Sequence, residues 1–324
     1  MDALRIYVDL AMPPEALDLL RAGTIRHELV FPANPISSVL AKGEPDPQFG
    51  TVEVAFGQPD LEAIRESQRL RWVHISSAGI TRYDTPEFRE LANTRGIAVS
   101  NSSEVYNEAC AVHVLSFMLA QARKLPLGLR TRAANGTAEW LAVRSNSRTL
   151  RDETVLLVGY GAIARRLAEL LDAFDVKIIA HRRQARGDEI VPVVTAEGLA
   201  TALAAADHVV NILPESEETC GFFDEARFAG MKPGAAFYNI GRGATVNQDA
   251  LLATLRSGRL GAAWLDVTEP EPLPEGHPLW AEPNCFITPH VAGGHTGEAK
   301  TLVRHFLKNL ERFVRHEPLL DRVM

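Results

Sequence analysis

Short apolar runs alternate with amphipathic segments from the start of the chain. In the first hundred residues a helix is expected to open at Pro13 and Pro14, and further helices cover 60–67, with Asp60 as N-cap, and 87–94. Strands that alternate with helices form parallel sheets with helical crossovers. The predicted strands are 4–10, 28–31, 52–56, 70–75 and 97–100.

A second series of strands and helices occupies the middle of the chain. It follows a long helix at 104–122 and an irregular, small-residue-rich stretch at 124–146. A complete set of strand–helix units is what a doubly wound dinucleotide-binding domain needs. The expected strands are 155–158, 176–180, 208–212, 236–240, 261–266 and 285–288, and the expected helices are 163–173, 196–205, 224–230 and 248–257.

The last helix, 298–316, has no strand after it and is expected to pack back on the first domain. We therefore predict an α/β protein of two Rossmann-like domains with an interdomain cleft. One is a flavodoxin-like split substrate domain, residues 1–102 and 291–324, and the other is a doubly wound dinucleotide-binding domain, residues 103–290. The helices 104–122 and 298–316 are expected to form the two crossings, and the cleft predicts hinge closure on binding.

The segment TVLLVGYGAIARR, at 154–166, carries the first motif with chemical meaning. Gly159 allows a tight turn after a strand, Gly161 lets the backbone approach a pyrophosphate, and the helix N-terminus offers free N–H groups. Ala164 stands at the third fingerprint position, where alanine is permitted. By itself the motif also fits a simple turn. The expected cofactor contacts here also include Tyr160, Ala162 and Ile163.

Composition narrows the class of protein. A length of 324 residues suits two domains, and the net charge of −7 argues against generic nucleic-acid binding. No apolar run approaches the roughly 18–20 residues that span a bilayer, and the N-terminus lacks a signal-peptide pattern. Cys110, Cys220 and Cys285 fit neither a disulfide framework nor a metal site. We expect a cytoplasmic protein without nucleic-acid or membrane partners and without a metal.

Polar residues follow the last three predicted strands of the second domain. Arg242 comes after strand 236–240, Glu269 and Glu271 lie shortly beyond strand 261–266, and His290 follows strand 285–288. Ligands of open parallel sheets bind beyond the carboxyl ends of the strands, so these side chains are expected at one edge. Separately, each also fits an ordinary loop residue. Two more strand-end residues, Pro214 and Asp266, are expected to contact the cofactor.

Together, the three side chains suit the reduction of a 2-keto acid. Arg242 provides a permanently charged, planar fork for the carboxylate and the carbonyl oxygen. His290 can give a proton to the developing alkoxide, and a carboxylate beside it, Glu271, favours the imidazolium. The hydride would come from a nicotinamide cofactor.

Several segments resemble the D-isomer-specific 2-hydroxyacid dehydrogenase family, which includes glyoxylate/hydroxypyruvate reductases and phosphoglycerate dehydrogenases. They span most of the chain and follow the family's order. The segments are SSAGITRYD (76–84), VSNSSEVYNEACAVHVLSFMLAQARK (99–124), LLVGYGAIARRLAELLDAF (156–174), MKPGAAFYNIGRGATVNQDALLATLRSGRLGAAWLDVTEPEPLP (231–274), HPLW (277–280) and NCFITPHVAGG (284–294).

The resemblance implies roles for particular residues. Arg242, Glu271 and His290 fall on the family's catalytic Arg, Glu and His, whereas the neighbours Glu269 and His295 match no catalytic position. This set would act on a small 2-keto or 2-hydroxy acid.

The resemblance also implies a substrate cradle and an assembly. The loop Ser77-Ala78-Gly79 resembles the family's backbone cradle for the substrate carboxylate, although it also fits a plain strand-to-helix turn. Relatives dimerise through the arm at 125–151, which implies a homodimer. Two departures, Val112 where the family often has Glu and Ala164 where it usually has Gly, remove no catalytic group.

Cofactor preference is expected to depend on the end of the second strand of the dinucleotide-binding domain. An NAD enzyme places Asp or Glu there to hold the ribose 2′-OH. Here Arg182 falls on that position with Arg183 beside it, Asp175 precedes the strand, and Asp188 and Glu189 lie well beyond it. Because arginine pairs with a 2′-phosphate, we predict NADP(H) as the preferred cofactor and NAD(H) as the alternative.

The leading hypothesis is an NADP(H)-dependent reductase that converts a small 2-keto acid, such as glyoxylate or hydroxypyruvate, into the D-2-hydroxy acid. One alternative is a catalytically idle NAD(P)-sensing module like the corepressors related to this family. Another is a formate or phosphite dehydrogenase on the same fold, although formate-type relatives carry a longer N-terminal extension. Substrate side-chain recognition is expected from the first domain, around Gly57, Ser77, Tyr83 and Trp280.

Overall fold

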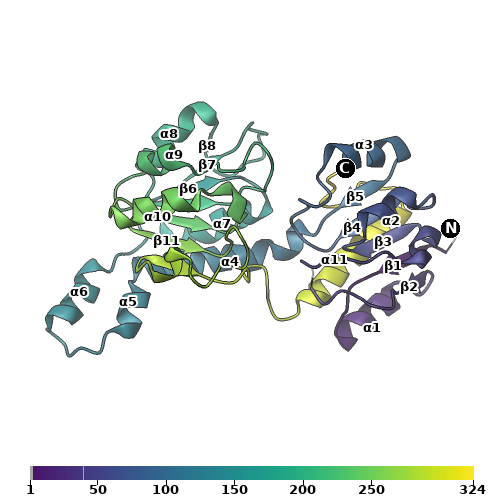
Figure 1. Ribbon diagram of the computed structural model, residues 1–324, viewed down its shortest axis with the longest axis horizontal. Coiled ribbons are helices and arrows are strands. Elements are labelled where there is room, and N and C mark those ends of the chain that lie inside the picture. Colours follow the sequence, from purple (N-terminus) through teal and green to yellow (C-terminus); the bar gives the residue numbers. More distant parts are fainter. Residues whose placement is uncertain (1–2, 39) are drawn as a thin grey trace. The chain divides into compact units, whose positions relative to one another are not determined.

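The computed structural model describes residues 3–38 and 40–324 and divides into two compact units (Figure 1). Unit 1 combines Met1–Tyr106 with Gly294–Met324, and unit 2 is Asn107–Gly293. The first residues of the predicted substrate domain, Met1 and Asp2, lie outside the described residues, as does Val39.

Unit 1 is built on a parallel sheet with the strand order β2-β1-β3-β4-β5. This is the flavodoxin-like order that the sequence predicts. The strands are β1 (Arg5–Val8), β2 (Glu28–Val30), β3 (Val54–Gly57), β4 (Trp72–Ile75) and β5 (Ala98–Ser100). The helical elements are α1 (Pro14–Gly23), the 3₁₀ turn η1 (Pro47–Thr51), α2 (Leu61–Glu66), α3 (Pro86–Arg95) and α11 (Glu298–Val314).

Side-chain caps fix where the short helices of unit 1 begin. The Asp60 carboxylate accepts hydrogen bonds from two backbone N–H groups in the first turn of α2, which confirms the predicted N-cap. Helix α3 begins in the same way at Thr85 and ends at Gly96, whose φ of 64° is the left-handed conformation that favours glycine.

The C-terminal helix α11 completes unit 1, as the sequence predicts. Its Phe306 ring stacks 4.2 Å from the ring of Phe56 and 5.3 Å from that of Trp72, and Phe313 lies 5.2 Å from Trp72. Phe56, Trp72 and Phe306 are fully buried. A helix that follows all of unit 2 in the sequence therefore covers one face of this sheet.

Unit 2 is built on a parallel sheet with the strand order β12-β11-β10-β9-β6-β7-β8. The chain starts in the interior with β6, moves outward through β7 and β8, and reverses direction with β9. This is the predicted doubly wound topology, and the reversal between β6 and β9 is the place where such sheets bind ligands. The strands are β6 (Thr154–Val158), β7 (Lys177–His181), β8 (Val193–Val194), β9 (His208–Asn211), β10 (Ala236–Asn239), β11 (Ala262–Leu265) and β12 (Cys285–Ile287).

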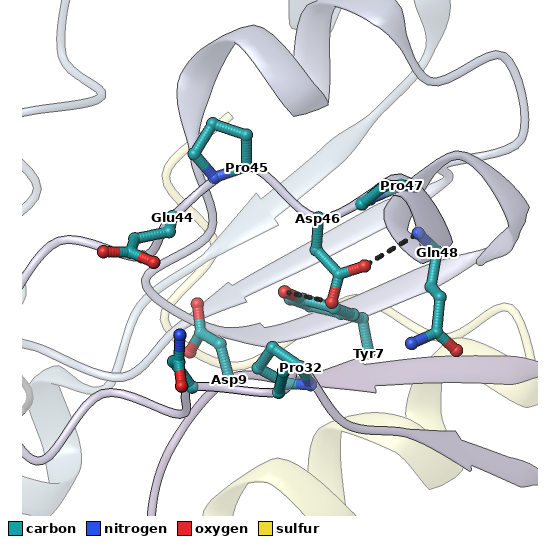
Figure 2. A pocket seen from close by; sticks show the side chains of 11 residues that line it. Tyr7, Asp9, Pro32, Glu44, Pro45, Asp46, Pro47 and Gln48 are labelled. Carbon is teal, nitrogen blue, oxygen red and sulfur yellow. Dashed lines mark hydrogen bonds between the residues drawn. The ribbon is translucent and has the colours of Figure 1, made fainter.

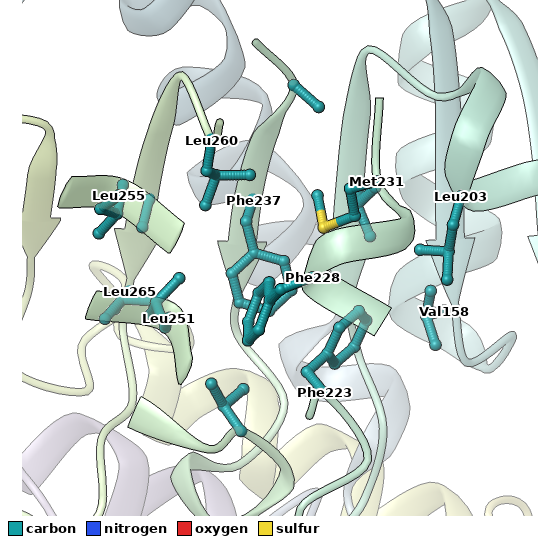
Figure 3. Close-up of a cluster of buried hydrophobic side chains, with 14 of the residues drawn as sticks. Val158, Leu203, Phe223, Phe228, Met231, Phe237, Leu251, Leu255, Leu260 and Leu265 are labelled. Atoms are coloured by element: carbon teal, nitrogen blue, oxygen red, sulfur yellow. The ribbon is translucent and has the colours of Figure 1, made fainter. Parts of the chain in front are cut away.

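The helices of unit 2 pack on this sheet through a core of aromatic and aliphatic side chains (Figure 3). Phe223 lies edge-on to Phe237 at 4.7 Å, and Phe228 lies edge-on to Phe237 at 5.2 Å. This core fixes the strands whose carboxyl ends carry the candidate site. The helical elements are α4 (Ser103–Ala122), whose first turn belongs to unit 1, α5 (Leu125–Arg130), α6 (Ala138–Asn146), α7 (Ala162–Leu171), η2 (Asp172–Phe174), α8 (Ala196–Ala205), α9 (Glu225–Gly230), η3 (Gly243–Thr245), α10 (Gln248–Arg256) and η4 (Pro278–Ala281).

Two sequence-based predictions about the path of the chain are wrong. The stretch 124–146 is not irregular, because it contains the helices α5 and α6. Neither helix has a buried residue, so the sequence shows no apolar face to signal them. The second crossing is also not the helix at 298–316: α11 lies wholly in unit 1, and the chain crosses in the preceding loop, at Gly293 and Gly294.

None of the helices in the described part of the chain is long and apolar enough to traverse a lipid bilayer.

Candidate active site

The turn from β6 into α7 has the geometry of a pyrophosphate site. Gly159 has a φ of 95°, and a Cβ there would lie 2.9 Å from the carbonyl oxygen of Ile212, so only glycine fits. At Gly161 a Cβ would meet no atom within 4 Å, so this side of the turn is open. Within the described residues, no side chain caps the N-terminus of α7, and Ala164 is fully buried. Open N–H groups beside an unhindered glycine fit a dinucleotide phosphate.

At the end of β7, the loop that follows Arg182 folds back on it. The Arg182 guanidinium pairs with Glu189, and with Asp188 at 3.2 Å, and it lies over the ring of Tyr160. The sequence places both acids well beyond the strand, and their return to Arg182 is a feature that sequence reasoning missed. The available signal is the pair of acids six and seven positions after the arginine, beyond Gly187. Arg183 forms a separate pair with Glu218 at 2.6 Å.

Two asparagines hold the loop that carries Arg242. Asn211, at the end of β9, donates to the side-chain oxygens of Asn239 at 3.0 Å and of Thr245 at 2.7 Å. Asn239, at the end of β10, donates to the carbonyl oxygen of Arg242 at 3.2 Å and accepts from the N–H of Gly241 at 3.1 Å. These hydrogen bonds fix the backbone conformation at Arg242, whose side chain is half-buried.

His290 and Glu271 lie in hydrogen-bond contact beyond the carboxyl ends of β11 and β12. The Nδ1 atom of His290 lies 2.5 Å from Oε1 of Glu271, and both side chains are partly accessible. The structure thus brings Glu271 to the histidine. Glu269 instead has its backbone N–H and carbonyl oxygen held by Gln248. His295, the competing histidine, belongs to unit 1.

Asp266 fixes the loop that carries His290. Its carboxylate accepts hydrogen bonds from the Thr288 hydroxyl at 2.6 Å and from the backbone N–H groups of Val291 and Ala292, both at 2.9 Å. Its carbonyl oxygen accepts from the N–H of His290 at 2.8 Å, and His290 has a φ of 52°. A non-glycine residue in the left-handed region costs free energy, so this network holds a strained histidine in place.

Helix α4 supports the same loop through His113. Its Nε2 lies 3.3 Å from the Thr288 hydroxyl and 3.7 Å from the Asp266 carboxylate. Desolvation lowers the pKa of His113, and the nearby Asp266 opposes that shift. The bond to Thr288 therefore joins a neutral imidazole to the Asp266 network.

In unit 1 the loop after β4 has its backbone carbonyls satisfied. Those of Ser76, Ser77, Ala78 and Gly79 accept hydrogen bonds from Tyr106, Ser102, Asn101 and Ser77, respectively. Throughout residues 3–38 and 40–324, by contrast, no hydrogen bond engages the N–H of Ala78 or Gly79. A loop whose carbonyls are tied and whose N–H groups are open suits an anion such as a carboxylate.

Two of the four residues expected to recognise the substrate side chain differ from that expectation, one in its burial and the other in the unit to which it belongs. Tyr83 is buried, and its hydroxyl donates to the carbonyl oxygen of Pro59 at 2.8 Å, so it is part of the core. Trp280 belongs to unit 2, and its indole N–H donates to the carbonyl oxygen of Pro274.

Unit 1 also contains a pocket of about 190 Å³ beside the end of β1 (Figure 2). The carboxyl groups of Asp9, Glu44 and Asp46 line it together with Tyr7, and no lysine or arginine does. Burial raises the pKa of Asp9 to about 6. Because the charged side chains that line this pocket are carboxyl groups, it would repel an anionic 2-keto acid and does not suit the predicted substrate.

The candidate residues thus fall into two groups. In unit 2, Arg242, Asp266 and His290 follow the adjacent strands β10, β11 and β12, and Glu271 pairs with His290. Pro214 follows β9, and its carbonyl oxygen accepts a hydrogen bond from the Thr219 hydroxyl at 2.6 Å.

In unit 1 the loop Ser77-Ala78-Gly79 forms the second group by itself. Across residues 3–38 and 40–324, no cluster of three or more His, Cys, Asp or Glu side chains is arranged to hold a metal ion.

A doubly wound sheet with an open glycine turn between its first strand and helix, in a chain that also has a flavodoxin-like unit, defines the class of two-domain NAD(P)-binding oxidoreductases. The family model for the D-isomer specific 2-hydroxyacid dehydrogenase, NAD binding domain, matches residues 115–292. The chain belongs to the D-isomer specific 2-hydroxyacid dehydrogenase family.

Individual relatives agree with this assignment. The glyoxylate reductase/hydroxypyruvate reductase of Homo sapiens is 33% identical over 253 residues, which are 77% of this chain and 76% of the human one. The structure of a D-isomer specific 2-hydroxyacid dehydrogenase from Xanthobacter autotrophicus Py2, in complex with NADPH and MES, matches with a TM-score of 0.82 at 25% identity, covering 100% of this chain and 98% of that one. An NADPH-dependent glyoxylate/hydroxypyruvate reductase from Sinorhizobium meliloti, in complex with NADP and sulfate, matches with a TM-score of 0.77 at 25% identity, covering 99% and 98%.

Proposed function

We propose that this protein is an NADP(H)-dependent reductase that converts a small 2-keto acid, such as glyoxylate or hydroxypyruvate, into the D-2-hydroxy acid. The observation that carries the proposal is the His290–Glu271 pair, 2.5 Å apart, beyond the same edge of the sheet as Arg242. The names of the human and Sinorhizobium meliloti relatives support these substrates.

In this mechanism each residue acts at a defined atom. Arg242 binds the substrate carboxylate and polarises the keto oxygen through its planar fork of donors. Glu271 accepts a hydrogen bond from Nδ1–H of the His290 imidazolium, so that Nε2–H can give its proton to the keto oxygen and leave a neutral imidazole. A nicotinamide cofactor held at the turn of Gly159 and Gly161 would supply the hydride for the keto carbon.

Each unit has its own part in this proposal. Unit 2 binds the dinucleotide, with the pyrophosphate at Gly159 and Gly161. Unit 1 receives the substrate carboxylate on the N–H groups of Ala78 and Gly79. The preference for NADP(H) rests on Arg182 and Arg183, and relatives solved with NADPH or NADP support it.

We also propose a cytoplasmic homodimer that pairs through α5 and α6. The side chains of Leu125, Leu127, Leu129 and Leu141 on these helices are exposed, with Leu129 84% accessible, and a second copy would cover them. We expect the protein to sediment as a dimer and Leu129→Glu to shift it toward the monomer. Sedimentation of Leu129→Glu as the intact wild-type dimer would contradict this interface.

The decisive experiment is a panel of 2-keto acids assayed with NADPH and with NADH. Turnover of glyoxylate or hydroxypyruvate at higher kcat/KM with NADPH is expected. A strong NADH preference would contradict the cofactor assignment. Dinucleotide binding without turnover of any substrate in the panel would favour the alternative, a cofactor-sensing module.

A further inference from the structure

The loop from Arg182 to Ile190 is folded around the carboxylate of Glu189. Besides Arg182, this carboxylate accepts the backbone N–H groups of Arg186 at 2.8 Å and Gly187 at 2.9 Å. The next residue, Ile190, donates its N–H to the Tyr160 hydroxyl at 3.2 Å, which ties the loop to the phosphate-binding turn. Glu189 is therefore part of the cofactor-binding region of unit 2.

The pair formed by Glu189 and Arg182 differs from its neighbours in burial. The Glu189 and Arg182 side chains are 6% and 12% exposed, whereas Glu218 and Arg183 are 70% and 80% exposed. Exposed ion pairs contribute little, but separating a buried pair leaves an uncompensated charge and is costly. The Arg182–Glu189 pair thus persists in solution, and the Arg183–Glu218 pair opens readily.

Protonation does not release Arg182 at ordinary pH. The backbone N–H of Arg186 and, after it, the Arg182 guanidinium lower the pKa of Glu189 to about 2, against the opposing effect of desolvation. The carboxylate is therefore charged at neutral pH. Only movement of the side chain, or competition by another anion, can free the arginine.

This arrangement makes the binding of a 2′-phosphate less favourable than it would be at an unpaired Arg182. In a doubly wound domain the ribose 2′ position is read at the end of the second strand, which is here the position of Arg182. A phosphate at Arg182 would lie beside the Glu189 carboxylate and meet like charge. A ribose hydroxyl could instead donate a hydrogen bond to that carboxylate, as it does to the acidic residue of an NAD enzyme.

We propose that Glu189 is a specificity-determining residue that holds Arg182 and so weakens the preference for a 2′-phosphorylated cofactor. The inference rests on the proposed function, in which Arg182 reads the 2′-phosphate. Glu189 thereby narrows the difference in affinity between NADP(H) and NAD(H) without reversing it. Asp188, whose side chain is 59% exposed, contributes in the same direction but less.

The test measures binding of two small probes by calorimetry. Adenosine 2′,5′-bisphosphate carries the 2′-phosphate and 5′-AMP does not, so their affinity ratio isolates this end of the site. Glu189→Gln keeps one acceptor oxygen for the loop N–H groups and is expected to raise the ratio by about tenfold or more. The matched control Glu218→Gln makes the same charge change at an exposed pair and is expected to alter the ratio less than about twofold.

Additional variants separate the possible failures. Should Glu189→Gln unfold, as melting would reveal, Asp188→Asn is expected to raise the ratio by about two- to threefold. The inference is overturned if the affinity ratio of the two probes stays unchanged or falls in Glu189→Gln. If Glu189→Gln unfolds, the same result in Asp188→Asn overturns it. The gain from Glu189→Gln should also shrink in an Arg182→Ala background. If Arg182→Ala alone leaves binding of the 2′,5′-bisphosphate intact, the proposed NADP(H) preference is what fails.

Discussion

The two glycines of the proposed phosphate-binding turn differ in what a methyl group would meet, so the same substitution should have opposite effects on the stability of the fold. Gly159→Ala forces an L-residue to a φ of 95° and places its Cβ 2.9 Å from the Ile212 carbonyl oxygen. Gly161→Ala keeps an extended conformation, φ −117° and ψ −158°, and meets no atom within 4 Å. The first substitution strains the folded protein, whereas the second only fills space beside the turn.

The magnitudes follow from these contacts. A left-handed φ costs an alanine about 1–2 kcal/mol, and moving the Ile212 peptide away adds about 1–2 kcal/mol. For unit 2, a total of about 3 kcal/mol corresponds to a fall in Tm of roughly 6–12 °C. Gly161→Ala should leave Tm unchanged or raise it slightly. Alanine reduces the conformational entropy of the unfolded chain, which stabilises the folded protein by about 0.4–1 kcal/mol.

Differential scanning calorimetry and titration with NADP+ together give the readout. Gly161→Ala is expected to weaken NADP+ binding by at least about tenfold at an unchanged Tm, because its methyl group occupies the place of the pyrophosphate. Gly159→Ala should lower Tm whether or not a nucleotide is present. Wild-type NADP+ affinity in Gly161→Ala would refute the location of the phosphate site, and an unchanged Tm in Gly159→Ala would refute the strain argument.

Three further substitutions test other parts of the structure. His290→Gln should reduce kcat by about 10²–10⁴-fold with NADP+ affinity retained, whereas the control His295→Gln should turn over normally. A similar loss of kcat in both variants would contradict the assignment of His290 as the proton donor. Asp266→Asn removes a hydrogen-bond acceptor from the His290 loop and should lower kcat by a larger factor than it raises KM for the keto acid. A change in Tm with unchanged kinetics would show that Asp266 is purely structural. Burial raises the pKa of Asp9 from 3.8 to about 6, so the folded state binds this proton more tightly and the free energy of unfolding falls as pH rises through that range. Asp9→Asn should remove this fall and add about 3 kcal/mol at most at pH 7 in urea unfolding; a parallel pH profile would contradict it.

The sequence predicts most of the fold because its signals are local. Apolar runs mark the strands, and caps such as Asp60 mark where helices begin. The alternation of strands and helices implies parallel order in both sheets. The helices α5 and α6 escape this reasoning because no residue of either is buried, and an exposed helix needs no apolar stripe.

The sequence predicts the site residues that directly follow strands. It does not predict contacts made by a loop that folds back on an earlier part of the chain. Arg242 and His290 come directly after strands, so topology alone places them at one edge. Glu189 reaches Arg182 only because two backbone N–H groups and a left-handed Gly187, with a φ of 79°, close the loop around it. The burial of Tyr83 depends likewise on a distant partner, the carbonyl of Pro59, which no pattern in the sequence reveals.

The position of α11 has a consequence for the order in which the protein acquires its structure on the ribosome. At about 5–20 residues per second, roughly 10–40 s separate the synthesis of β5 from that of α11. During that interval the aromatic rings of Phe56 and Trp72 have no Phe306 above them, while the whole of unit 2 is made without interruption. The synthesis of unit 2 is therefore complete before unit 1 receives its last helix, and until then the N-terminal sheet lacks the apolar cover that α11 provides. A chain released before Glu298 keeps that surface permanently and is a substrate for aggregation or proteolysis.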